Sequence, residues 1–76
     1  MARENFIVSA SGSGWAIERD GALVTRTPRR EQALLLARSA AHRAFLNGSR
    51  SAVMVRGADD TLCVEWQFGF EDALTG

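Results

Sequence analysis

The segment Trp15-Ala16-Ile17-Glu18-Arg19-Asp20-Gly21-Ala22-Leu23-Val24-Thr25 decides how the chain begins to fold. Large apolar residues alternate with small or charged ones before Asp20-Gly21, and a second strand-like run follows it. The Asp-Gly pair tolerates the positive φ angles of a type I′ turn, whose twist matches that of the two strands it joins. The segment therefore predicts an antiparallel hairpin with strands over 15–19 and 22–25.

Three more stretches have the composition of short strands. The run 6–9 is apolar and β-branched, and the glycines and serines of 10–14 predict a flexible loop after it. The run 51–56 predicts a fourth strand, and a turn then leads to a fifth strand over 61–68, which has the clearest period-two pattern in the chain. This alternation predicts one face with Leu62, Val64, Trp66 and Phe68, and an opposite face with Cys63, Glu65 and Gln67.

One helix is predicted between the third and fourth strands. Thr27 is a capping residue, and Pro28 suits the first helical position because the N–H it lacks has no partner there. The helix is expected to run to about Leu46 and to end at Asn47-Gly48, where glycine adopts the left-handed conformation that closes a helix. Alanine dominates the predicted core-facing arc, so the helix axis can come close to the sheet. The residues on this arc are Ala33, Leu34, Leu36, Ala37, Ala40, Ala41, Ala44 and Phe45.

These elements define an α+β fold in one small domain over residues 1–76. The expected order is βββαββ, with one helix packed on one face of an antiparallel sheet. The ordered core is expected over about 5–69, with 70–76 as a tail. A chain of 76 residues buries only about 60% of the surface that its unfolded form exposes, so we expect one small domain and no two-domain enzyme.

Composition removes several classes of function. Nine arginines balance nine acidic residues, so the chain as a whole lacks the positive charge that drives most nucleic-acid binding. No apolar run is long enough to span a membrane, and the N-terminus does not resemble a signal peptide, so a cytoplasmic location is expected.

No set of residues with a catalytic pattern is evident. Cys63 and His42 are predicted to lie on opposite sides of the helix–sheet layer, too far apart for a thiol–imidazole pair. Asp59-Asp60 is interpreted as a turn rather than as a pair of catalytic or metal-binding carboxylates. We therefore expect no enzyme, no metal site and no cofactor.

Two surfaces are candidates for contact with a protein. Leu35, Ser39, His42 and Leu46 follow one another at steps of four, three and four along the predicted helix, the spacing of a helix–helix seam. Single exposed leucines are also common on ordinary surfaces, and that interpretation stays open. The second candidate is the sheet face that the helix leaves uncovered. The residues expected there are Ile7, Ala16, Glu18, Met54, Arg56, Cys63, Glu65 and Gln67.

A basic cluster at the start of the predicted helix is the third candidate. Arg26, Arg29 and Arg30 lie where the positive end of the helix dipole disfavours cations. The cluster is either a set of solvated side chains or a contact for phosphate groups of a nucleic acid or for an acidic partner.

Several of these stretches together carry a family likeness. Gly14-Trp15-Ala16-Ile17, the helical run Glu31 to Arg38, the strand Val53 to Gly57 and the closing Trp66-Gln67-Phe68-Gly69 resemble the small bacterial domain-of-unknown-function family 2188. The family pattern is a glycine–tryptophan strand, a helix rich in alanine and a terminal hairpin. The resemblance implies the fold and brings no catalytic or binding residues with it.

Three hypotheses of function follow. The first is a non-enzymatic module that binds a protein partner or forms a homodimer, through the helix stripe or the uncovered sheet face. The second is a narrower form of the first: a phage-encoded inhibitor of a host defence complex, similar to anti-CRISPR proteins in size and in the lack of an active site. The third is a nucleic-acid-binding protein that uses Arg26, Arg29 and Arg30, which the neutral net charge disfavours.

Overall fold

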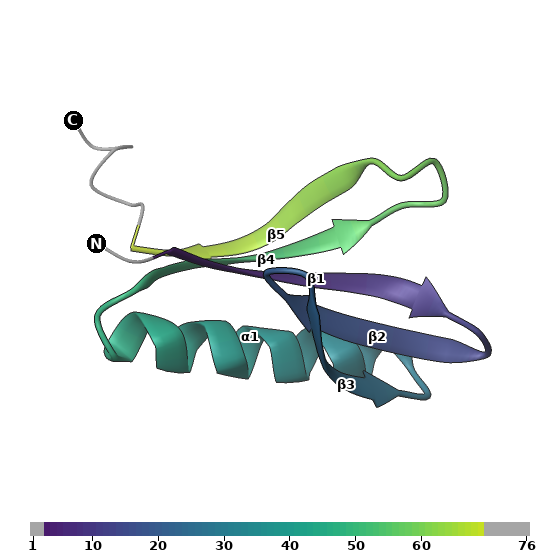
Figure 1. The fold of residues 1–76 in the computed structure, drawn as a ribbon, viewed down its shortest axis with the longest axis horizontal. Helices are drawn as coiled ribbons and strands as arrows, with labels where there is room; N and C mark the ends of the chain where they lie inside the picture. Colours follow the sequence, from purple (N-terminus) through teal and green to yellow (C-terminus); the bar gives the residue numbers. More distant parts are fainter. Residues whose placement is uncertain (1–2, 70–76) are drawn as a thin grey trace.

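A five-stranded sheet with one helix on one face makes up the computed structural model, which describes residues 3–69 (Figure 1). The predicted α+β class and the order βββαββ are confirmed, and the predicted tail 70–76 lies outside the described residues. The elements are β1 (Arg3–Ser11), β2 (Gly14–Arg19), β3 (Ala22–Thr27), α1 (Arg30–Leu46), β4 (Arg50–Arg56) and β5 (Leu62–Phe68).

Tight turns join the first three strands. Asp20 and Gly21 both have positive φ, at 52° and 89°, as the predicted type I′ turn requires. The predicted flexible loop over 10–14 is wrong, because Ser11 pairs with Gly14 and leaves only a two-residue turn. Gly12 occupies that turn with φ 58°, a conformation that glycine adopts without strain.

The sheet is mixed rather than wholly antiparallel, which corrects the prediction. Its strand order is β3-β2-β1-β4-β5, and β1 and β4 run parallel while the other three neighbouring pairs are antiparallel. The reason is the helical crossover: α1 returns the chain to the end of the sheet at which β3 began, so β4 runs in the direction of β3 and β1. β1 and β4 therefore form a parallel pair near the middle of the sheet.

The helix begins later than predicted and ends where predicted. Thr27 is still part of β3, and its Oγ1 donates a hydrogen bond of 2.9 Å to the carbonyl of Arg29, which is the N-cap residue without a side-chain cap. The predicted capping role of Thr27 is therefore wrong, and Pro28 precedes the helix. Gly48 has φ 100° directly after the C-cap Asn47, as the predicted glycine stop requires.

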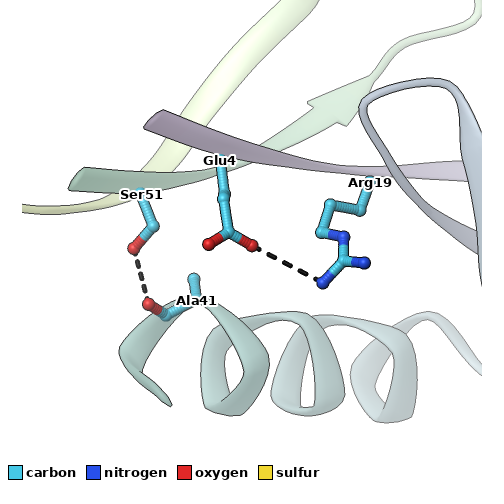
Figure 2. Close-up of polar contacts among 4 residues, drawn as sticks. All are labelled: Glu4, Arg19, Ala41 and Ser51. Carbon is cyan, nitrogen blue, oxygen red and sulfur yellow. Dashed lines mark hydrogen bonds and ion pairs between the residues drawn. The ribbon is translucent and has the colours of Figure 1, made fainter. Parts of the chain in front are cut away.

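The core lies between α1 and the inner sides of the central strands. Phe6, Val8, Ile17 and Val53 are buried against the helix alanines, so the predicted alanine stripe does face the sheet. Polar contacts bridge the same layer: the Ser51 hydroxyl donates to the carbonyl of Ala41, as Figure 2 shows. Glu4 on β1 pairs there with Arg19 on β2 at 3.6 Å (Figure 2).

The close approach of β2 and β3 leaves no room for a side chain at Gly14. A Cβ atom at this position would lie 2.6 Å from the carbonyl oxygen of Thr27 on β3. We expect Gly14→Ala to lower the free energy of unfolding by about 2 kcal/mol, because backbone has to move to admit the methyl group. Urea denaturation measures the loss, with Ser13→Ala in the adjacent exposed turn as the matched control. Equal stability of the two variants would contradict the steric account.

Candidate functional site

The outer surface of α1 is unusually apolar. The helix buries Ala33, Ala37, Ala41 and Ala44 against the sheet and turns its larger side chains outward. Leu35 is 62% exposed and Leu46 is 68% exposed. Leu36 and Phe45, which were predicted to face the core, are also exposed, because the sheet leaves room only for small residues beneath the helix axis. Leu34 packs against the core, but the other four large apolar side chains of the helix face solvent, the reverse of an ordinary surface helix.

Three of the four predicted stripe residues share one hollow. Leu35, Ser39 and His42 line a shallow depression of about 300 Å³ together with Arg38 and Phe68. Leu46 lies at the end of the helix and does not line it. We define the outer α1 surface as the exposed residues around this hollow and along the same side: Leu35, Arg38, Ser39, His42, Arg43 and Leu46.

Aromatic side chains form the border of this surface toward β5. The His42 ring lies 5.3 Å from the Phe68 ring and 6.5 Å from the Phe45 ring, and the two phenylalanine rings are 6.1 Å apart. Sequence reasoning placed His42 in solvent and did not connect it to Phe68. The signal that could have predicted this contact was the position of Phe68 at the end of the last strand, beside the C-terminal half of the helix.

Positive charge is concentrated on the helix. Residues 29–46 carry four arginines and one glutamate, although the whole chain is neutral. The Arg38 guanidinium lies 5.3 Å from the centre of the Trp66 ring, so a cation–π contact anchors one of these arginines at the rim of the hollow. The outer α1 surface is therefore both basic and apolar.

The predicted arginine cluster is not one site. Arg30 lies over the Trp15 ring, at 6.0 Å from its centre, on the side of the sheet that faces α1. Arg26 lies on the edge strand β3, in register with Ala16, and lines a separate hollow with Gln32, Leu35 and Leu36 of α1. Arg29 is the N-cap residue between them. The structure therefore divides Arg26 from Arg30 instead of bringing the three guanidinium groups together.

The uncovered sheet face, which we name the open face, differs from the prediction along β5. The β4–β5 pairing has a bulge at Glu65, since Val53 is opposite Trp66 whereas Met54 is opposite Val64. The extra residue reverses the alternation, so Leu62 and Val64 lie on the open face and Trp66 and Phe68 on the helix side. The prediction that these four share one face is wrong. Cys63, opposite the core residue Val55, is likewise on the helix side.

The remaining predicted residues of the open face lie where expected. Register with strand neighbours places these residues there: Ile7, Ala16, Glu18, Met54, Arg56 and Gln67. Leu23, opposite Glu18, adds a further exposed apolar side chain on β3. The amide oxygen of Asn5, on the same side of β1, is buried and has no hydrogen-bond partner within residues 3–69.

Groups capable of chemistry do not converge. Cys63 is exposed and lies five residues from Phe68 along β5, about 16 Å in an extended strand, whereas His42 contacts Phe68 itself. The N–H of Thr61 donates to Asp59 Oδ1 at 3.1 Å and lowers the pKa of that carboxyl, as in a turn stabilised by its aspartate. In the described range 3–69, no three His, Cys, Asp or Glu side chains are grouped as metal ligands.

Comparisons with known proteins give no relative. No family model, curated protein or solved structure matches this chain. Within the described part of the chain, α1 falls short of the length and apolar character that a membrane span requires.

Proposed function

We propose that the protein is a small non-enzymatic binding module whose outer α1 surface binds an acidic protein partner. The observation that carries the proposal is the inverted helix: four alanines face the core while Leu35 and Leu46 face solvent. Large apolar side chains grouped on one exposed face are typical of an interaction surface. The shallow hollow beside Phe68 offers a place for one apolar side chain of the partner.

Charge decides the kind of partner. Arg38 and Arg43 flank the leucines, and the helix carries one glutamate. A second copy docked helix to helix would bring like charges together, which disfavours association. An acidic segment with apolar side chains complements both properties of the surface. Nucleic acid satisfies the arginines but leaves the leucines against a charged backbone, so this alternative is less well supported.

The experiment compares what three forms of the tagged protein retain from a lysate of the native host, with and without nuclease treatment. The wild type is expected to retain at least one acidic protein, and Leu35→Glu/Leu46→Glu to lose it, because the change adds repulsion to an acidic partner and removes apolar contact. Ala58→Glu, in the exposed β4–β5 turn, is the control for added negative charge and is expected to retain the same protein. Circular dichroism establishes that all three forms are folded.

Two results would contradict the proposal. One is an identical set of retained proteins for the wild type and the double variant. The other is the disappearance of every partner on nuclease treatment, which would favour a nucleic-acid-binding function and the arginines near the start of α1.

Narrower proposals follow from the same surface. A phage-encoded inhibitor of a host defence complex, similar to an anti-CRISPR protein, is supported by the chain length and by the small α+β fold, and a defence-complex subunit among the retained proteins would establish it. We also propose membership of the domain-of-unknown-function family 2188, which the Gly14-Trp15 strand start and the terminal hairpin support. We propose a cytoplasmic location as well.

A further inference from the structure

We propose that the open face binds a second copy of this chain in a two-fold symmetric homodimer, with the two sheets stacked between two outer helices. This inference does not depend on which partner the outer α1 surface binds. It rests on three properties of the open face: an uncovered parallel strand pair, a self-complementary pattern of side chains, and a sufficient area.

The uncovered pair is β1 and β4. Parallel strands are ordinarily covered on both faces, whereas here α1 covers only one. On the other side, β1 and β4 present the large apolar side chains Ile7 and Met54, and the edge strands add Leu23 and Val64, which is 53% exposed. A mainly apolar band, interrupted by Glu18 on β2, therefore crosses the open face.

Strand register gives the order of side chains in this band. Ile7 on β1 is in register with Glu18 on β2 and with Met54 on β4. Glu18 in turn is opposite Leu23 on β3, and Met54 is opposite Val64 on β5. From β3 to β5 the band thus consists of Leu23, Glu18, Ile7, Met54 and Val64. β1 is the middle strand of the five, with two strands on either side.

This order makes the band complementary to itself. Consider a two-fold axis that runs parallel to β1, midway between the two stacked sheets. It places β1 over β1 of the second copy, β2 over β4 of the second copy, and β3 over β5 of the second copy. Ile7 then meets Ile7 of the second copy, and Leu23 meets Val64. Such a contact is isologous and closes as a dimer. Face-to-face sheets keep their strand directions within about 30° of one another. The Ile7 contact on the axis is kept at any such angle, and at the full angle the facing edge strands shift by about 5 Å along their length.

The charged residues of the open face fit the same arrangement. Glu18 faces Met54 of the second copy, and Arg56 lies two residues further along that strand, about 6.6 Å away and on the same face. An arginine side chain spans this distance. Arg56 of the second copy faces Ala16, which is buried among its neighbours on this face. Within each copy Arg56 lies 3.8 Å from Asp60, an exposed carboxylate in the β4–β5 turn, so the dimer replaces two exposed Arg56–Asp60 pairs with two Glu18–Arg56 pairs between the copies. A helix-to-helix dimer would gain only like charges.

The area of the face suits a stable dimer. Five strands spaced about 4.8 Å apart, with about seven residues each at 3.3 Å per residue, project an area of about 550 Å² per copy. Because side chains project from the sheet, the accessible surface of the face is larger than this flat projection. The accessible surface is therefore on the scale of the ~800 Å² per partner that a standard interface buries. The dimer leaves both outer α1 surfaces exposed on opposite sides, so it would be bivalent for a partner.

Molar mass in solution tests the proposal, measured by sedimentation equilibrium over a range of concentrations. The wild type is expected at twice 8.3 kDa. Glu18→Arg is expected to raise the dimer dissociation constant at least about ten-fold, because two arginines then face one another. The exchange Glu18→Arg/Arg56→Glu restores opposite charges and is expected to recover most of that loss, a result that a merely misfolded single variant would not give.

Two further variants distinguish the surfaces. Val64→Glu, at the exposed end of the apolar band, is expected to give a monomer with an unchanged circular dichroism spectrum. Leu46→Glu on the outer α1 surface is the matched control and is expected to remain a dimer. The proposal is overturned by a wild-type monomer at every concentration, by failure of the charge exchange to restore association, or by a dimer that Leu46→Glu dissociates and Val64→Glu does not.

Discussion

An alanine at position 17 is expected to lower the free energy of unfolding by about 3 kcal/mol. Ile17 is 1% exposed and lies in the core between β2 and the helix alanines. The change removes three carbon atoms from a site where the neighbouring alanines have no side-chain freedom to fill the space. A domain of this size has a total stability of only about 4–11 kcal/mol, so the expected loss is a large part of it.

Urea denaturation at one fixed protein concentration measures this loss, since dimer formation would make the apparent stability depend on concentration. Val24→Ala on β3 is the matched control, because Val24 is 50% exposed and the loss of its two methyl groups there is expected to cost at most about 0.5 kcal/mol. A similar cost at both positions would mean that the layer between sheet and helix is not closely packed around Ile17.

Local signals in the sequence predicted the features that depend on neighbouring residues. Asp20-Gly21 predicted the type I′ turn, and Asn47-Gly48 predicted the helix end, since both depend on the few residues that tolerate positive φ. The predicted helix start was wrong because Thr27 has two other roles. As the last residue of β3 it pairs with Trp15 of β2, and its hydroxyl donates a hydrogen bond to the carbonyl of Arg29. Strand pairing outweighed its preference as a cap.

The mixed sheet was deducible from the predicted order of elements. A meander of three antiparallel strands has edges β1 and β3 that point the same way. A helix after β3 returns the chain, so the next strand is parallel to either edge that it joins. An entirely antiparallel sheet was therefore incompatible with βββαββ and one helical crossover, and the parallel β1–β4 pair follows from topology alone.

The composition of the two candidate surfaces was harder to predict. The alternation along β5 was clear in the sequence, but the bulge at Glu65 reversed it and moved Leu62 and Val64 to the open face. A bulge depends on the pairing of two strands and has no reliable local signature when no glycine marks it. The grouping of His42 with Phe68 likewise depends on how the helix lies beside β5.

The alanine stripe leads to the second large expected effect, which concerns the distance between helix and sheet. We expect Ala37→Leu to lower the free energy of unfolding by about 3 kcal/mol, although leucine favours helices almost as much as alanine does. Ala37 is fully buried in the middle of α1 and packs against the core of the sheet. Three added carbon atoms have no cavity to enter, so they push the helix away from Val8 and Val53.

Gln32→Leu is the matched control for this change. Position 32 is exposed on the same helix, so a leucine there alters propensity and surface without altering the layer beneath, and the expected change is within about 0.5 kcal/mol. A tolerated leucine at position 37 would show that the helix can lift from the sheet at little cost. The outward leucines would then be free to exchange places with the alanines by rotation of the helix, and their exposure would no longer favour a partner. A large loss at position 37 and none at position 32 would instead mean that close packing holds the leucines outward, where a partner can bind them.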